Sequence, residues 1–121
     1  MNKAESEAVI FRQTGDVTIA ALQTTEITSK ASDMIQVRLR EMQNRGPAVK
    51  LVLDLSKLDF LGSVGLSVLV LLLQRVRKGE GRLALAGLTG LCRDVMRVTG
   101  LERAFQICDD VPAALKVLAK A

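Results

Sequence analysis

The most apolar part of the chain is a short run followed, after a polar loop, by a second and longer run. The first, Leu51 to Leu55, is nearly continuous in apolar residues, which is typical of a central parallel strand covered on both faces. The second begins at Ser63 and predicts a helix extending to about Lys78. In open α/β sheets, groups that meet a ligand or partner lie just beyond the carboxyl ends of the strands, so the loop ending at Ser63 is the first candidate site.

Strand-like and helix-like segments alternate along the rest of the chain. Val9 to Arg12 and Val17 to Leu22 flank Gly15 and predict an antiparallel hairpin. Further elements are expected at residues 29–45 (helix), 82–86 (strand), 89–98 (helix), 104–108 (strand) and from 109 onward (helix). This order predicts an α/β fold with a mixed, mostly parallel sheet of four to five strands, an N-terminal hairpin at its edge and about four helices. A single domain is expected over residues 1–121.

The helix that begins at Ser63 is apolar on two sides. One stripe at helical spacing is expected to face the sheet, and it consists of Leu66, Leu69, Val70, Leu73 and Val76. The other side carries Val64, Val68, Leu71 and Leu72. Two covers for that second side remain open: a neighbouring helix of the same domain, or a partner protein that docks near Ser63.

The net charge of +4 does not by itself indicate nucleic acid binding. Arg75, Arg77, Lys78 and Arg82 gather around a Gly-Glu-Gly turn, where cations also suit the end of a helix. The chain has no Trp or Tyr and only three Phe, so base-stacking side chains are missing. We therefore expect no nucleic acid partner.

Composition also argues against metal sites, cofactors, membrane spans and catalysis. Two cysteines without any histidine cannot form a zinc site of four N or S ligands, and histidine is also the commonest general base. Asp54 and Asp59 are more simply explained as loop-fixing side chains than as paired catalytic carboxylates. The apolar run from Leu66 to Leu73 is too short to span a bilayer, and residues 1–6 have no signal-like apolar segment. A cytoplasmic protein that is not an enzyme and carries no cofactor is expected.

Four segments resemble the STAS domains, and within them the bacterial anti-sigma factor antagonists. They are Val52 to Ser56, Leu58 to Leu66, Val98 to Leu101, and Phe105 to Ile107. The family's best-known segment has the form Asp-Ser-Ser/Thr-Gly at the start of the second helix, and its first serine is phosphorylated by a partner kinase. Matched by position, that serine is Ser63 and the glycine is Gly65, whereas Gly62 replaces the acid and Val64 replaces the second hydroxyl residue.

The resemblance implies a regulatory module that binds a kinase-like anti-sigma factor and is switched by phosphorylation of Ser63. The partner-binding residues expected from it are Asp59, Gly62, Ser63, Val64, Gly65, Val68 and Leu72. Independently of any phosphate, Ser63 is expected to cap the helix that it begins. Loss of the acid at Gly62 favours an alternative, an unphosphorylated STAS-type accessory subunit of a transporter ATPase or a signalling assembly.

Overall fold

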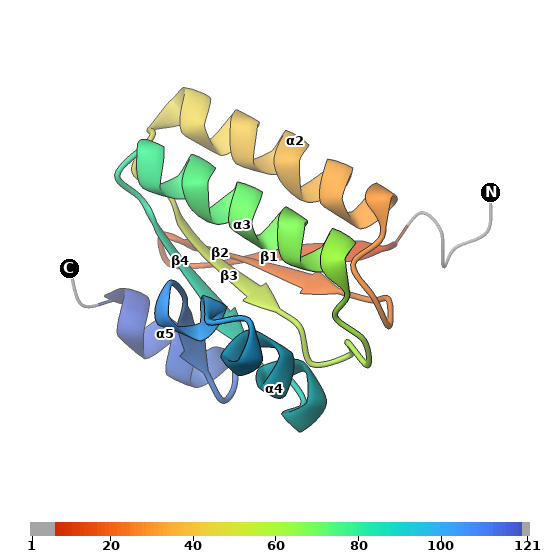
Figure 1. The fold of residues 1–121 in the computed structure, drawn as a ribbon. Helices are drawn as coiled ribbons and strands as arrows, with labels where there is room; N and C mark the ends of the chain where they lie inside the picture. Colours follow the sequence, from red (N-terminus) through yellow and green to blue (C-terminus); the bar gives the residue numbers. More distant parts are fainter. Residues whose placement is uncertain (1–6, 120–121) are drawn as a thin grey trace.

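A computed structural model describes residues 7–119, which form one sheet with helices on both faces (Figure 1). In these residues the strand order is β1-β2-β3-β4-β5; β1 is antiparallel to β2 and every other neighbouring pair is parallel. The strands are β1 (Val9–Thr14), β2 (Val17–Leu22), β3 (Lys50–Asp54), β4 (Arg82–Ala86) and β5 (Gln106–Cys108). Residues 1–6, where no signal segment is predicted, and residues 120–121 lie outside the described part.

The helices divide unequally between the two faces of the sheet. They are α2 (Ser29–Arg45), α3 (Ser63–Lys78), α4 (Gly90–Val98) and α5 (Val111–Ala119), with a short 3₁₀ helix η1 (Leu101–Arg103) between α4 and β5. α2, α3 and α4 contribute to one apolar core, and α5 packs on the other face (Figure 1). Three successive crossovers on one face follow from strands that are added in one direction with constant handedness.

The predicted fold class is confirmed, and most element boundaries agree with the structure. α2, α3 and β4 span the predicted residues, and the two-residue turn of the hairpin has Gly15 at a φ of 59°. The helix predicted over residues 89–98 begins at Gly90 because Thr89 is its N-cap. The last strand is shorter than the predicted 104–108, since Ala104 ends η1 as its C-cap and Phe105 lies in the bend before the strand.

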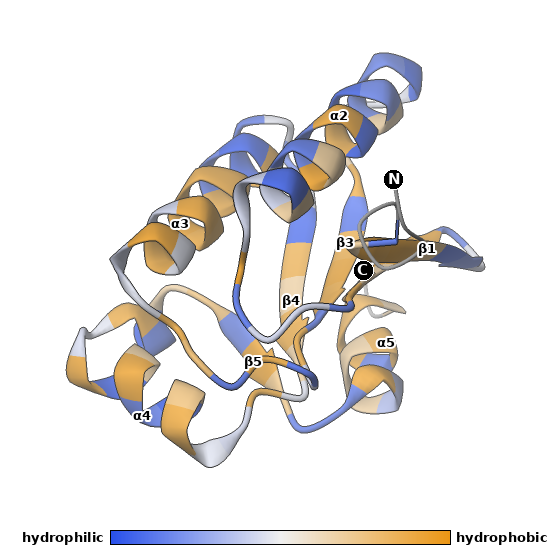
Figure 2. Cartoon of the chain, turned by 90° about the vertical axis from the view of Figure 1, so that its right-hand side faces the viewer, coloured by the Kyte–Doolittle hydropathy of each residue, from blue (hydrophilic) through white to orange (hydrophobic). Residues whose placement is uncertain are grey.

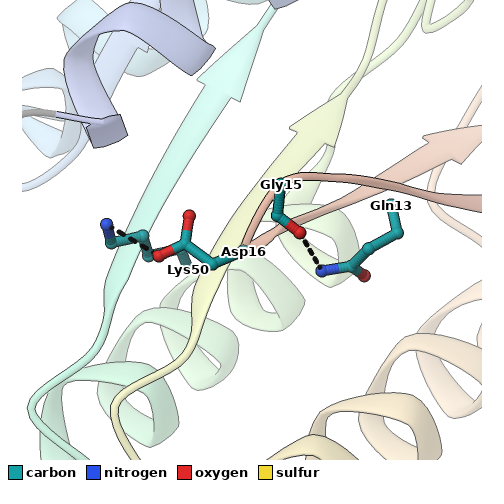
Figure 3. A network of polar contacts seen from close by, with 4 residues as sticks. All are labelled: Gln13, Gly15, Asp16 and Lys50. Atoms are coloured by element: carbon teal, nitrogen blue, oxygen red, sulfur yellow. Dashed lines mark hydrogen bonds and ion pairs between the residues drawn. The ribbon is translucent and has the colours of Figure 1, made fainter.

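The turn of the hairpin is attached to the beginning of the central strand. The Asp16 carboxylate lies 3.1 Å from the Lys50 ammonium group, and the Gln13 side-chain amide donates to the Gly15 carbonyl at 3.3 Å (Figure 3). An exposed ion pair of this kind contributes about 0–1 kcal/mol, so its main role is to fix the position of the turn. It also neutralises the charge of Lys50 at this edge of the sheet.

The helix α3 is rotated relative to the orientation expected from its apolar stripe. Leu69, Leu73 and Val76 are buried as predicted, but Leu72 is also fully buried, at 0% exposure. Leu66 and Val70 are half-buried instead, and they line a shallow groove on the outer side together with Ser67, Leu71 and Gln74. Figure 2 shows that α3 is largely apolar along most of its length, which is why its sequence period did not define a single buried face.

The helix α4 likewise does not bury all of its regularly spaced apolar residues. Leu91, Val95 and Val98 recur at helical spacing, yet Leu91 and Val98 are exposed. Cys92 and Met96 are buried in their place. Both are less hydrophobic by the usual scales than Leu and Val, so their i, i+4 spacing is a weaker signal of a buried face.

Candidate functional site

The loop between β3 and α3 is held mainly by the neighbouring loop between β2 and α2. The backbone N–H groups of Asp59 and Phe60 both donate to the carbonyl oxygen of Thr25, at 2.8 and 3.2 Å. The Lys57 ammonium group donates to the Gln23 side chain at 2.6 Å. These contacts bring two segments, far apart in the sequence, together at the carboxyl edge of the sheet.

Of the two acids that the sequence placed in this loop, only one fixes it through its side chain. The Asp54 carboxylate accepts the backbone N–H of Ser56 at 3.1 Å. Asp59 forms no side-chain hydrogen bond or ion pair with the described residues, and it is held through its backbone. The loop-fixing role is therefore found for Asp54 and not for the Asp59 carboxylate.

The first turns of α2 and α3 lie side by side and line a partly open cavity of about 400 Å³. Its lining residues come from both helix starts and from the loop before α3: Glu26, Ile27, Thr28, Ser29, Phe60, Gly62, Ser63, Val64 and Gly65. The N-terminal turn of a helix carries free N–H groups and a partial positive charge. Two such turns at one cavity create a surface suited to an anionic or hydrogen-bond-accepting group.

Ser63 is the first residue of α3 and not its cap. The N-cap is Gly62, which makes no side-chain hydrogen bond. The side chain of Ser63 is exposed, and its hydroxyl forms no hydrogen bond with the described residues; its carbonyl oxygen accepts the hydroxyl of Ser67 at 2.9 Å. The expectation that Ser63 caps the helix is thus wrong. Its hydroxyl is exposed at the surface.

Capping distinguishes Thr28 from Ser63 in a way that can be measured. Thr28 caps α2, because its hydroxyl oxygen accepts the backbone N–H of Ala31 at 3.1 Å. Thr28→Ala is expected to lower the free energy of unfolding by about 1 kcal/mol. Ser63→Ala is expected to leave it unchanged within about 0.5 kcal/mol. Urea titrations of the two variants check this, and equal losses would contradict the assignment of the caps.

The two glycines at the start of α3, Gly62 and Gly65, differ in how closely their surroundings approach. A Cβ atom at Gly65 would lie 3.0 Å from a Leu61 methyl group and 3.5 Å from an Ile27 methyl group, so glycine allows the first turn of α3 to approach the segment before α2. A Cβ atom at Gly62 would lie 2.8 Å from the Phe60 ring, a side chain that is 59% exposed. Because this exposed ring can turn away, the contact does not require glycine at position 62.

The structure brings together five of the seven predicted partner-binding residues. Gly62, Ser63, Val64 and Gly65 line the cavity, and Asp59 lies in the adjoining loop. Val68 is half-buried against the core, and Leu72 is fully buried, so Leu72 has no surface with which to contact a partner. Sequence reasoning missed Phe60, although an aromatic residue in a polar loop was a usable signal.

Two carboxylates at this edge follow the last strand. Asp109 and Asp110 follow β5; Asp109 pairs with Arg93 at 3.0 Å, and Asp110 caps α5 by accepting the N–H of Ala113 at 2.9 Å. Burial, aided by these two acids, raises the pKa of the Cys108 thiol. Cys108 and Cys92 belong to the cores on opposite faces of the sheet, and both are free thiols.

Two further features of the described residues bear on the kind of site. No group of three or more Cys, Asp or Glu side chains within residues 7–119 is arranged to hold a metal ion. None of the helices in that range is both long and apolar enough to cross a membrane. At the carboxyl edge, these residues present the exposed hydroxyl of Ser63, the first turns of α2 and α3, and the exposed apolar side chains of Phe60 and Val64.

The sequence profile of the STAS domain family matches residues 8–114, and the chain belongs to that family. It is similar to a Bordetella bronchiseptica protein provisionally named anti-sigma factor antagonist BtrV, with 30% identity over 96 residues, covering 79% of this chain and 81% of that relative. Within the family, the chain is thus an anti-sigma factor antagonist-like STAS domain. Proteins of this family are regulatory binding modules.

Two solved structures share the fold over nearly their whole length. A Thermotoga maritima protein, provisionally described as an anti-sigma factor antagonist, has a TM-score of 0.77 at 21% identity, covering 97% of this chain and 99% of that one. The anti-sigma factor antagonist SpoIIAA in its unphosphorylated form has a TM-score of 0.70 at 17% identity, covering 94% and 99%. At these identities the likeness concerns the architecture.

Proposed function

We propose that this chain is a cytoplasmic anti-sigma factor antagonist that binds a kinase-type anti-sigma factor through the surface around Ser63. The observation that carries the proposal is the exposed, unbonded hydroxyl of Ser63 at a cavity formed by two helix starts. The relative BtrV, which is named as an antagonist of an anti-sigma factor, supports the class of partner. Binding and release of a protein, without catalysis by this chain, is the proposed activity.

An apolar rim next to the hydroxyl supports protein docking. Phe60 and Val64 are 59% and 65% exposed, although both are large apolar side chains. The outer groove of α3, lined in part by Leu66 and Val70, continues this surface along the helix. Apolar side chains that gather around one polar site are typical of a protein interface.

Phosphorylation of Ser63 would release such a partner without unfolding the domain. A phosphate adds about −1.5 to −2 charges, and the free N–H groups and dipole of a helix start tolerate it. The same charge, pressed against an apolar partner surface, loses its hydration without gaining a compensating group. The proposed switch is therefore a change in surface charge at a fixed structure.

The test is to incubate the protein with ATP and each co-encoded anti-sigma kinase and to locate the phosphate by mass spectrometry. One phosphate on Ser63 is expected, and Ser63→Ala is expected to remain unmodified. Since Ser63→Ala removes no cap, the control should be folded. Phosphate on another residue would contradict the assignment of Ser63.

A second candidate keeps the binding surface but removes the switch. Gly62 stands where the family has an acid, so the polar group before the serine is missing. This favours an unphosphorylated STAS subunit that docks on a transporter ATPase or a signalling assembly. Stable binding of a co-encoded partner, together with no phosphate on Ser63 in the experiment above, would select this candidate.

A further inference from the structure

A second pocket, of about 410 Å³, lies at the edge of the sheet opposite to Ser63. Because α2 and α3 both connect parallel strands, both run away from the carboxyl edge, and their last turns end next to each other (Figure 1). The pocket is lined by residues from these two ends: Arg40, Gln43, Pro47, Arg75, Lys78 and Gly79. The chain at this edge is far from the loop that carries the proposed function.

Two contacts fix the helix ends that flank this pocket. The side-chain amide of Gln43 on α2 donates to the carbonyl oxygen of Arg75 on α3 at 3.0 Å and ties the two helices together. A Cβ atom at Gly79 would collide with the carbonyl oxygen of Pro47, so the turn after α3 packs directly on the segment after α2. The position of the two helix ends is therefore fixed by the fold, and the long side chains of Arg40, Arg75 and Lys78 line the open pocket between them.

Three cations converge on this pocket without an anion. Arg40, Arg75 and Lys78 form no ion pair with the residues that the structure describes. Glu41 and Glu80, the acids nearest to them in sequence, form none either. By contrast, Lys50 at the same edge is paired with Asp16 (Figure 3).

The helix dipole accounts for only part of this arrangement. Cations in the last turn of α3, such as Arg75 and Lys78, are stabilised there. The dipole effect falls off within one turn, and Arg40 lies more than a turn before the end of α2 at Arg45. Its convergence with the cations of α3 places like charges together, which is unfavourable unless an anion joins them.

We infer that this pocket binds an acidic segment of a partner protein, with its carboxylates placed among Arg40, Arg75 and Lys78. No aromatic side chain lines the pocket, so stacking on nucleic acid bases has no platform there. None of the large apolar side chains that are exposed in residues 7–119 lines it either, which removes the anchors that a membrane surface requires. A compact basic pocket instead fits a short run of Asp or Glu side chains.

This pocket works independently of Ser63. The two sites lie at opposite ends of α3, whose 16 residues span about 24 Å. At physiological ionic strength the Debye length is about 8 Å, so a charge at one end is screened from the other. The domain can thus hold an acidic segment while its other end gains or loses a partner.

The probe for this inference is fluorescein-labelled hexaglutamate, titrated with the full chain and followed by fluorescence anisotropy. Binding that weakens with added salt is expected, and Arg40→Gln/Arg75→Gln/Lys78→Gln should weaken it about tenfold, since three exposed ion pairs are lost. The matched control Arg12→Gln/Arg97→Gln/Lys116→Gln changes the net charge equally outside the pocket, and it should bind within about twofold of the native chain. Ser63→Asp should also bind as the native chain does.

Several outcomes would overturn the inference. Equal losses in the two triple variants would show that only net charge matters. Tighter binding of a DNA duplex, or of phosphatidylserine vesicles, than of hexaglutamate would assign the pocket to another class of polyanion. Circular dichroism of both triple variants confirms that they are folded, and a single variant, Arg40→Glu, which should weaken binding at least as much as Arg40→Gln, repeats the test with less change to α3.

Discussion

Ser63→Asp is expected to weaken binding of the partner anti-sigma protein by at least about 100-fold, or about 2.7 kcal/mol. The exposed hydroxyl is flanked by Phe60 and Val64, so a carboxylate in its place would be buried against an apolar surface. The free energy of unfolding should be unchanged or higher by a few tenths of a kcal/mol, because an acid suits the first turn of a helix. Isothermal titration calorimetry with the co-encoded partner, and urea unfolding, measure the two quantities.

The control for this prediction is Ser63→Asn, which has nearly the size of aspartate but no charge. It should bind within about threefold of the native chain, since the hydroxyl makes no hydrogen bond that the domain requires. A loss shared by the Asn and Asp variants would mean that size at position 63 decides binding. In that case the mechanism based on charge would be lost, although the position of the interface would remain.

Leu72→Ala is expected to lower the free energy of unfolding by about 2–5 kcal/mol. Leu72 is fully buried in the core formed by α2, α3, α4 and the sheet, and its truncation leaves a cavity there. Urea unfolding followed by circular dichroism should show a lower midpoint with an unchanged m-value. The decrease in the free energy of unfolding distinguishes a core position from an exposed docking position on the same helix.

Val64→Ala is the matched variant, one that shortens an exposed side chain near the beginning of α3. At 65% exposure, Val64 should contribute less than about 0.5 kcal/mol to stability, while its loss should weaken partner binding. If Leu72→Ala were harmless to stability, the burial of Leu72 would be contradicted. If Val64→Ala bound the partner as well as the native chain, Val64 would lie outside the interface.

The sequence predicted the fold because several local signals agreed. Gly15 lies in the hairpin turn, α2 ends at Arg45 as expected, and α5 follows its cap Asp110 within two residues of the expected start. The orientation of α3 was not predictable, since a helix that is apolar on most sides has no unique buried face. The predicted N-cap of α3 differs from the observed one by a single residue. Gly62 is extended and is the N-cap, and Ser63 is the first helical residue.

The candidate site was predictable only in part, for reasons of distance along the chain. The loop ending at Ser63 followed from its place after the central strand. Its second wall, from Glu26 to Ser29, depends on backbone contacts of Thr25 with residues more than 30 positions away. The convergence of Arg40 with Arg75 and Lys78 likewise requires two helices to end side by side. Such long-range placement is a property of the packed structure, and no local pattern indicates it.

The double hydrogen bond to the Thr25 carbonyl has a consequence for how related proteins can diverge. The anchor is a main-chain oxygen, so it does not depend on which side chain stands at position 25. Substitutions in the loop can therefore alter which protein is recognised while the path of the loop stays the same. A scaffold of this kind lets partner choice change between duplicated copies through the exposed loop positions, while the buried Leu58 and Leu61 stay fixed by the core.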